Sequence, residues 1–141
     1  MTYATWERWR LRCYNPPMPK KKAFVVDDNR LTAESLAKML SLLDVESIIC
    51  LGSREALQKL AATVPDFMTL DVNMPGVSGI EVLRYIRRDP RTAKLPIIVI
   101  SSDAQTQQQA TAIAAGANIF LAKPVSFEHL EAAVKDALEK N

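Results

Sequence analysis

The sequence predicts an α/β fold built on a doubly wound, five-stranded parallel sheet. Two observations predict it. Five short apolar runs alternate strictly with five segments of helical periodicity. The runs are also continuously apolar, as expected for strands that helices cover on both faces. Such alternation forms a parallel sheet with right-handed crossovers, and 141 residues suffice for one domain of this kind to bury its own core.

The first half of the pattern begins at 23–27, an apolar run that ends in acidic residues. Apolar residues then recur at helical spacing over 31–43, and the β-branched segment 45–51 is the next predicted strand. A helix is expected over 53–63, because a serine stands at its N-cap and a proline follows it. Residues 67–70 form the third apolar run, which leads directly into an aspartate.

The second half repeats the alternation. A loop that contains proline and glycine precedes a helix through 80–86, and 96–100 is the fourth apolar run. The Gln- and Ala-rich segment 104–115 is closed by a glycine, which predicts a helix with a polar face. After the fifth run at 119–122, a serine caps the last helix, which is expected over 126–140.

Residues 1–22 differ in character from the domain that we expect over 23–141. They hold six basic residues against one glutamate, a net charge of +5. Because the whole chain carries +2, the remainder sums to −3, and we expect no direct nucleic-acid binding despite the basic tail. We expect a short helix over 3–13 and a Pro-rich linker over 15–22. Both tryptophans lie in this extension, which is either leftover upstream sequence or an arm for docking or dimerisation.

Composition also indicates the compartment. Two distant cysteines and a single histidine lack metal-ligand spacing, which fits a reducing cytoplasm and argues against a zinc site. No apolar run approaches the ~20 residues that a membrane-spanning helix needs. The N-terminus also lacks the apolar region of a signal peptide. We therefore expect a cytoplasmic protein without a membrane span.

Polar side chains stand at the carboxyl ends of four predicted strands, where ligands bind in open parallel sheets. Asp27 and Asp28 follow the first strand, Asp71 the third, Ser101 the fourth and Lys123 the fifth. Each residue alone would most often be a cap, a turn or a surface charge, so only their joint occurrence is informative. Clustered carboxylates repel one another unless a cation joins them, and Mg²⁺ prefers oxygen ligands. With an amine and a hydroxyl opposite, the cluster predicts a site that holds a phosphoryl group on or beside a carboxylate nucleophile.

On these residues the chain resembles the receiver domain of response regulators, the phosphate-accepting module of two-component signalling and phosphorelays. The resemblance covers roughly residues 22–140. It implies a flavodoxin-like (β/α)5 fold with strand order 2-1-3-4-5. The matching motifs are the pair Asp27-Asp28, the segment LDVNMPG at 70–76, Ser101, and the pair Lys123-Pro124.

The resemblance implies a role for each residue of the acidic cluster. Asp71 would be the phosphoacceptor, and Lys123 would pair with the phosphoryl group. Mg²⁺ would be the cofactor, bound directly by Asp28, Asp71 and the backbone carbonyl of Asn73. Asp27 would help to hold the ion through a water molecule.

The resemblance also implies a switch. Ser101 would move to hydrogen-bond the phosphoryl group, Phe120 would change rotamer, and the face formed by 104–140 would change partners. Phe120 lacks a hydroxyl, which excludes a switch that relies on a tyrosine hydrogen bond. Asp103 is expected to cap the helix that follows it, and the Lys123-Pro124 bond is expected to be cis.

The implied protein is a phosphorylatable regulator that catalyses only its own phosphorylation and dephosphorylation. Its implied partners are a sensor histidine kinase or phosphotransfer protein, and a downstream protein or output domain. Phosphorylation-dependent dimerisation is a further hypothesis. No output domain follows Asn141, so we expect either a stand-alone regulator or a receiver cut from a longer chain.

Three alternatives stay open. A degenerate receiver would act by protein binding alone. A haloacid-dehalogenase-like phosphatase would place a second acid at position 73, where Asn73 stands, and would carry a cap domain. A nucleotide- or flavin-binding module would place glycines at 27–30, where two acids stand. The last two are therefore disfavoured.

Overall fold

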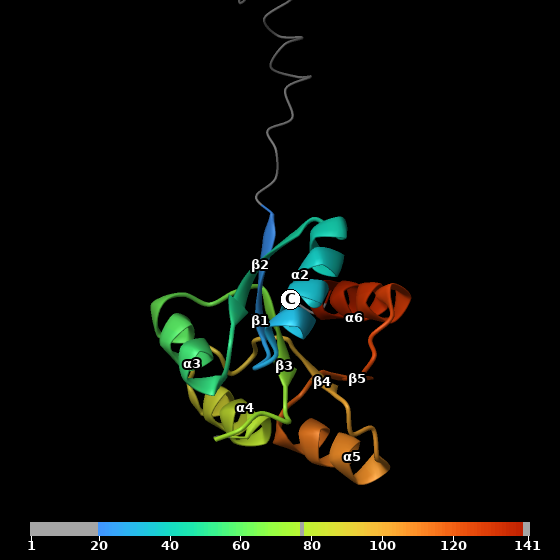
Figure 1. Cartoon of the computed structure of the whole chain (residues 1–141). Helices are drawn as coiled ribbons and strands as arrows, with labels where there is room; N and C mark the ends of the chain where they lie inside the picture. The colour runs from blue at the N-terminus through green and yellow to red at the C-terminus, as the bar shows by residue number, and fades with distance from the viewer. Residues whose placement is uncertain (1–19, 77, 140–141) are drawn as a thin grey trace, which may run out of the picture.

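The computed structural model describes residues 20–76 and 78–139, so the expected helix at 3–13 and the aromatic arm lie outside the described residues. Five strands form one parallel sheet in the order β2-β1-β3-β4-β5, which confirms the order that the resemblance implied (Figure 1). The strands are β1 (Lys21–Val26), β2 (Val45–Cys50), β3 (Phe67–Asp71), β4 (Ile97–Ser101) and β5 (Ile119–Ala122).

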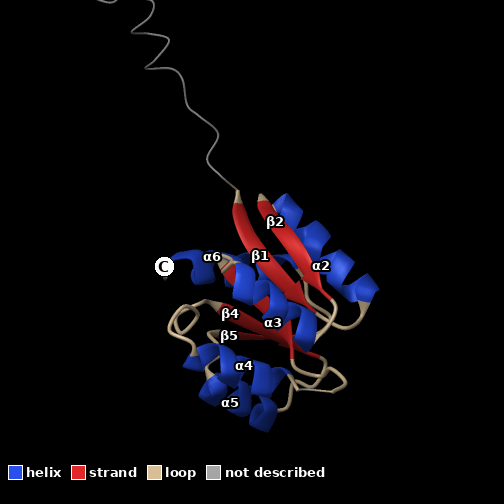
Figure 2. Cartoon of the chain, turned by 90° about the vertical axis from the view of Figure 1, so that its left-hand side faces the viewer, coloured by secondary structure: helices blue, strands red, loops and turns tan. Residues whose placement is uncertain are grey.

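Helices cover both faces of the sheet, as the continuous apolar runs predicted (Figures 1 and 2). One face carries α2 (Arg30–Leu42) and α6 (Phe127–Glu139). The other carries α3 (Ser53–Ala62), α4 (Gly79–Arg88) and α5 (Thr106–Ala115). None of the helices in the described part of the chain is long and apolar enough to cross a membrane.

The strands supply side chains to two cores, one on each face. Phe24 and Met68 pack toward α3, α4 and α5, whereas Val25 and Phe67 pack toward α2 and α6. Every residue of β3 and β4 is buried. Because successive side chains alternate between faces, a strand buried on both sides has no position for an exposed polar residue.

The sheet begins two residues earlier than expected. Lys21 and Lys22 pair in parallel register with Val45 and Glu46 of β2. Their backbone therefore belongs to the sheet, although both side chains are exposed. The linker interpretation of 15–22 is wrong for these two residues, because strand pairing depends on the backbone and tolerates solvated lysines at the strand's exposed start.

Two expected helix caps are also wrong. Ser53 is the first residue of α3, and Gly52 occupies the N-cap position. Helix α5 begins at Thr106 with Gln105 as its N-cap, so Asp103 lies outside the helix. The Asp103 carboxylate instead accepts a hydrogen bond from the Gln105 N–H at 3.2 Å. A turn formed by the loop itself thus replaces the expected cap.

Candidate functional site

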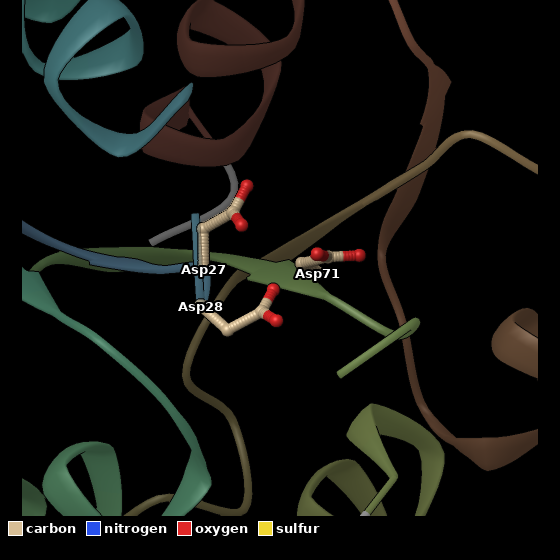
Figure 3. A group of neighbouring side chains, drawn as sticks. All are labelled: Asp27, Asp28 and Asp71. Atoms are coloured by element: carbon tan, nitrogen blue, oxygen red, sulfur yellow. The ribbon is translucent and has the colours of Figure 1, made fainter. Parts of the chain in front are cut away.

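Three carboxylates meet at the carboxyl ends of β1 and β3. Asp27 and Asp28 directly follow β1, and Asp71 is the last residue of the neighbouring strand β3. Their side chains project from the two strands toward the same side (Figure 3), and one oxygen of each lies within 4.8 Å of the others. Asp27 and Asp71 are buried, at 1% and 5% exposure, whereas Asp28 is exposed. The pocket therefore has a buried floor and a solvent-facing rim.

Local turns orient the two buried carboxylates. The Oδ1 atom of Asp27 accepts a hydrogen bond from the Asn29 N–H at 2.9 Å. The Oδ1 atom of Asp71 accepts one from the Asn73 N–H at 3.0 Å. Each aspartate thus binds the backbone two residues later, a local pattern that Asp side chains favour. These bonds leave the two Oδ2 atoms directed at a common neighbour.

That neighbour is Lys123, at the end of β5. Its Nζ atom lies 3.0 Å from Asp27 Oδ2 and 3.4 Å from Asp71 Oδ2. Burial opposes the charged form of Lys123, but the hydrogen bonds and charges of the two aspartates outweigh burial and raise its pKa. The structure thereby brings together the residues that the sequence placed at three strand ends.

One ammonium cannot neutralise two buried carboxylates. Burial raises the pKa of the Asp71 carboxyl, and the charge of Asp27 raises it further, while the Asn73 N–H and Lys123 act in the opposite direction. Before Asp28 is counted, the pocket already carries one uncompensated negative charge. This imbalance favours binding of a cation.

The donor set fits Mg²⁺. All three carboxylates offer hard oxygen ligands within a space of 4.8 Å, and Mg²⁺ binds through one or two carboxylates while it keeps several waters. The exposure of Asp28 leaves the rim open for those waters. Among the described residues, this cluster holds no cysteine sulfur or histidine nitrogen ligand, so its chemistry does not suit zinc.

Ser101 is fully buried at the end of β4, beside the acidic cluster. Its Oγ atom accepts a hydrogen bond from Asn73 Nδ2 at 2.9 Å and a second from the Asp103 N–H at 3.0 Å. The resemblance implied only a backbone role for Asn73, and no motif indicated that its side chain would contact Ser101. That contact depends on the loop after β3 lying against the end of the neighbouring strand β4.

The remaining expected residues lie on or next to β5. Phe120 is half-buried and packs against the core on the α3, α4 and α5 face. The Lys123-Pro124 peptide bond is cis, as the resemblance implied. Ser102 and Lys123 line a cavity of about 580 Å³ between α2 and the β5–α6 connection, with Leu31 and Leu36 on its apolar side.

Gly79 is a site residue that was expected only as part of the loop before the helix. It begins α4, and its N–H donates to the Val72 carbonyl at 3.3 Å. A Cβ atom at this position would lie 2.4 Å from Val72 Cα and 2.6 Å from the Asp71 carbonyl oxygen. Only glycine lets α4 approach the backbone that carries Asp71 so closely. The glycine after the Pro-containing loop was the one available signal.

Comparisons with known proteins agree with this geometry. The model of the family described as the response regulator receiver domain matches residues 23–135. The phosphate regulon transcriptional regulatory protein PhoB of Rhizobium meliloti is 34% identical over 119 residues, which cover 84% of this chain and 52% of that protein. The response regulator MprA of Mycolicibacterium vanbaalenii is also 34% identical over 119 residues, with coverage of 84% and 51%. The chain therefore spans about half the length of these curated relatives.

Solved structures show the same similarity. A putative response regulator from Chloroflexus aurantiacus superposes with a TM-score of 0.83 at 30% identity, covering 86% of this chain and 99% of that chain. The chemotaxis protein CheY4 of Vibrio cholerae superposes with a TM-score of 0.80 at 26% identity, covering 85% and 100%. The fold is thus shared with chains that consist of little else.

Proposed function

The chain belongs to the response regulator receiver domain family, and from this premise we propose that Asp71 accepts a phosphoryl group from a phosphohistidine donor. One observation carries the proposal: a buried carboxylate at the end of β3 lies beside both an amine and two further carboxylates. A carboxylate oxygen of Asp71 forms a bond to phosphorus while the bond from phosphorus to the donor's imidazole nitrogen breaks. The products are an acyl phosphate on Asp71 and a histidine that takes up a proton.

The residues around Asp71 have distinct proposed roles. Lys123 already lies 3.4 Å from Asp71 Oδ2 and would pair with an oxygen of the phosphoryl group. Asp28, Asp71 and the Asn73 carbonyl would hold Mg²⁺ directly, and Asp27 would hold it through water. Bound there, Mg²⁺ would supply positive charge to the transferring oxygens.

The proposed output is a change of surface. Ser101 would move toward the phosphoryl group, and Phe120 would adjust in the space that the hydroxyl leaves. Residues 104–140 would then present a different face to a partner protein or an output domain. A receiver is a phosphorylatable regulator rather than a true enzyme, and its family implies a histidine kinase or phosphotransfer partner.

The proposed domain division places a basic extension before a receiver domain that follows it. The extension would comprise residues 1–22 and the domain 23–141, with the structural correction that the first strand already includes Lys21 and Lys22. A related hypothesis is that phosphorylation causes dimerisation, and the extension is one candidate for the dimer contact. Size-exclusion chromatography of the phosphorylated chain, with and without residues 1–19, distinguishes dimerisation through the extension from dimerisation through the receiver domain itself.

The direct test is phosphorylation by a small-molecule donor. The protein is incubated with acetyl phosphate and Mg²⁺, and intact mass spectrometry measures the adduct. We expect a Mg²⁺-dependent, base-labile phosphate that is absent from Asp71→Asn and present in the control Asp89→Asn, at the far end of α4. If the folded wild type forms no adduct, the chain is a degenerate receiver that acts by binding. Steady release of phosphate over many turnovers would instead favour the phosphatase alternative.

A further inference from the structure

We propose that the Asn73 side chain is a positioning residue that holds the Ser101 hydroxyl in the unphosphorylated state and ties it to the start of α5. This inference rests on the proposed function of Asp71 and deepens it. It assigns a role to the side chain of Asn73, a residue that was expected to act only through its backbone carbonyl. The role is to set how readily the switch leaves its resting position.

Asn73 joins the phosphoacceptor to the switch residue. Its backbone N–H donates to Asp71 Oδ1 at 3.0 Å, and its side-chain Nδ2 donates to Ser101 Oγ at 2.9 Å. Ser101 is fully buried, so in this position its oxygen depends on protein donors rather than water. The bond to Asn73 is therefore lost when the hydroxyl moves, and it stabilises only the resting arrangement.

Hydrogen bonds continue from Ser101 to α5. The Asp103 N–H donates to Ser101 Oγ at 3.0 Å, and Asp103 Oδ1 accepts from the Gln105 N–H at 3.2 Å. Gln105 is the N-cap of α5, and its own side chain makes no capping bond. The first turn of α5 is thus oriented by loop bonds that begin at Ser101.

The two ends of α5 are held by different kinds of contact. Its buried residues are Ala112 and Ala115, both in the second half. At its C-terminal end, Arg87 donates two hydrogen bonds to the Gly116 carbonyl, at 3.0 and 2.8 Å. In the N-terminal half, the side-chain hydrogen bonds among the described residues stay local, such as the one from Gln109 Nε2 to the Ala104 carbonyl at 3.0 Å. Release of Ser101 would therefore move the start of the helix while its end stays in place.

The first readout needs no phosphorylation. In metal-free buffer, we expect Asn73→Ala to speed backbone hydrogen exchange at Asp103 about fivefold, the population ratio that one hydrogen bond supports. Exchange at Ala117, whose N–H donates to the Ala112 carbonyl at the far end of α5, should not change. Asn73 is exposed, so this substitution leaves the core intact. Unchanged exchange at Asp103 would overturn the proposal.

The second readout is a double-mutant cycle with the phosphoryl mimic beryllofluoride and Mg²⁺. Asn73→Ala should tighten binding about fivefold in the wild-type background, because the resting state loses a stabilising bond. In the Ser101→Ala background the same substitution should have no such effect. Equal effects in both backgrounds would show that Asn73 acts on the site without Ser101, which would overturn the proposed positioning role. If wild type fails to bind the mimic and forms no acyl phosphate, the proposed function fails, whatever the exchange result.

Discussion

Replacing Lys123 with methionine should destabilise the metal-free fold by about 3 kcal/mol near pH 7. The Nζ atom lies 3.0 Å from Asp27 Oδ2 and 3.4 Å from Asp71 Oδ2. At an effective dielectric constant of about 20, each contact contributes roughly 5 kcal/mol of attraction. Burial of the ammonium offsets part of this gain. Because the Lys123 side chain is 22% exposed, we expect a loss at the lower end of the ~3–5 kcal/mol typical of broken buried pairs.

The pH dependence follows from the raised pKa of Lys123. A raised folded-state pKa contributes stability that is complete below the unfolded value of about 10.4. That stability is lost as pH rises through the folded value. At pH 7 the contribution is therefore fully present in wild type. In the variant, acid should narrow the deficit, because protonation removes the charge that Asp71, whose pKa burial raises, would otherwise carry without a partner.

Urea unfolding followed by circular dichroism measures the loss, in the presence of EDTA. The control is Lys20→Met, whose ammonium lies 3.7 Å from Asp44 with both side chains largely exposed, at 62% and 82%. It should change the free energy of unfolding by less than ~0.5 kcal/mol. Mg²⁺ should restore part of the stability of Lys123→Met, because it supplies the missing positive charge. A loss no larger than that of the control, or no response to Mg²⁺, would refute this account of the pocket.

Three further substitutions test other parts of the structure. Gly79→Ala forces a methyl group to 2.4 Å from Val72 Cα, so thermal unfolding should show a loss of about 1–3 kcal/mol, and phosphorylation by acetyl phosphate should slow. Arg87→Ala removes both bonds to the Gly116 carbonyl and should cost about 2–3 kcal/mol in urea unfolding. Burial raises the pKa of the Cys50 thiol to about 11. In a Cys13→Ser variant, iodoacetamide should therefore modify the protein at pH 8 only after unfolding. Rapid modification of the folded chain would contradict the burial of Cys50.

The sequence by itself determined the fold class and the location of the site. Continuous apolar runs require strands covered on both faces, and strict alternation with helices leaves the parallel doubly wound sheet as the consistent solution. In such a sheet the carboxyl ends of all strands share one edge. The strand pattern alone therefore assigns Asp27, Asp71 and Lys123 to one cluster, although they are distant in sequence.

Tertiary structure alone decided which atoms meet within that cluster. Lys123 reaches an aspartate 96 positions earlier, and the sharing of its ammonium depends on rotamers set by packing. The Asn73 side chain contacts Ser101 only because the loop after β3 lies against the end of β4, and Gly79 matters only because the start of α4 lies against Asp71 and Val72. Hydrophobic periodicity specifies which residues are buried and in which order. Hydrogen bonds between loops depend on ångström-scale positions that no local pattern in the chain encodes.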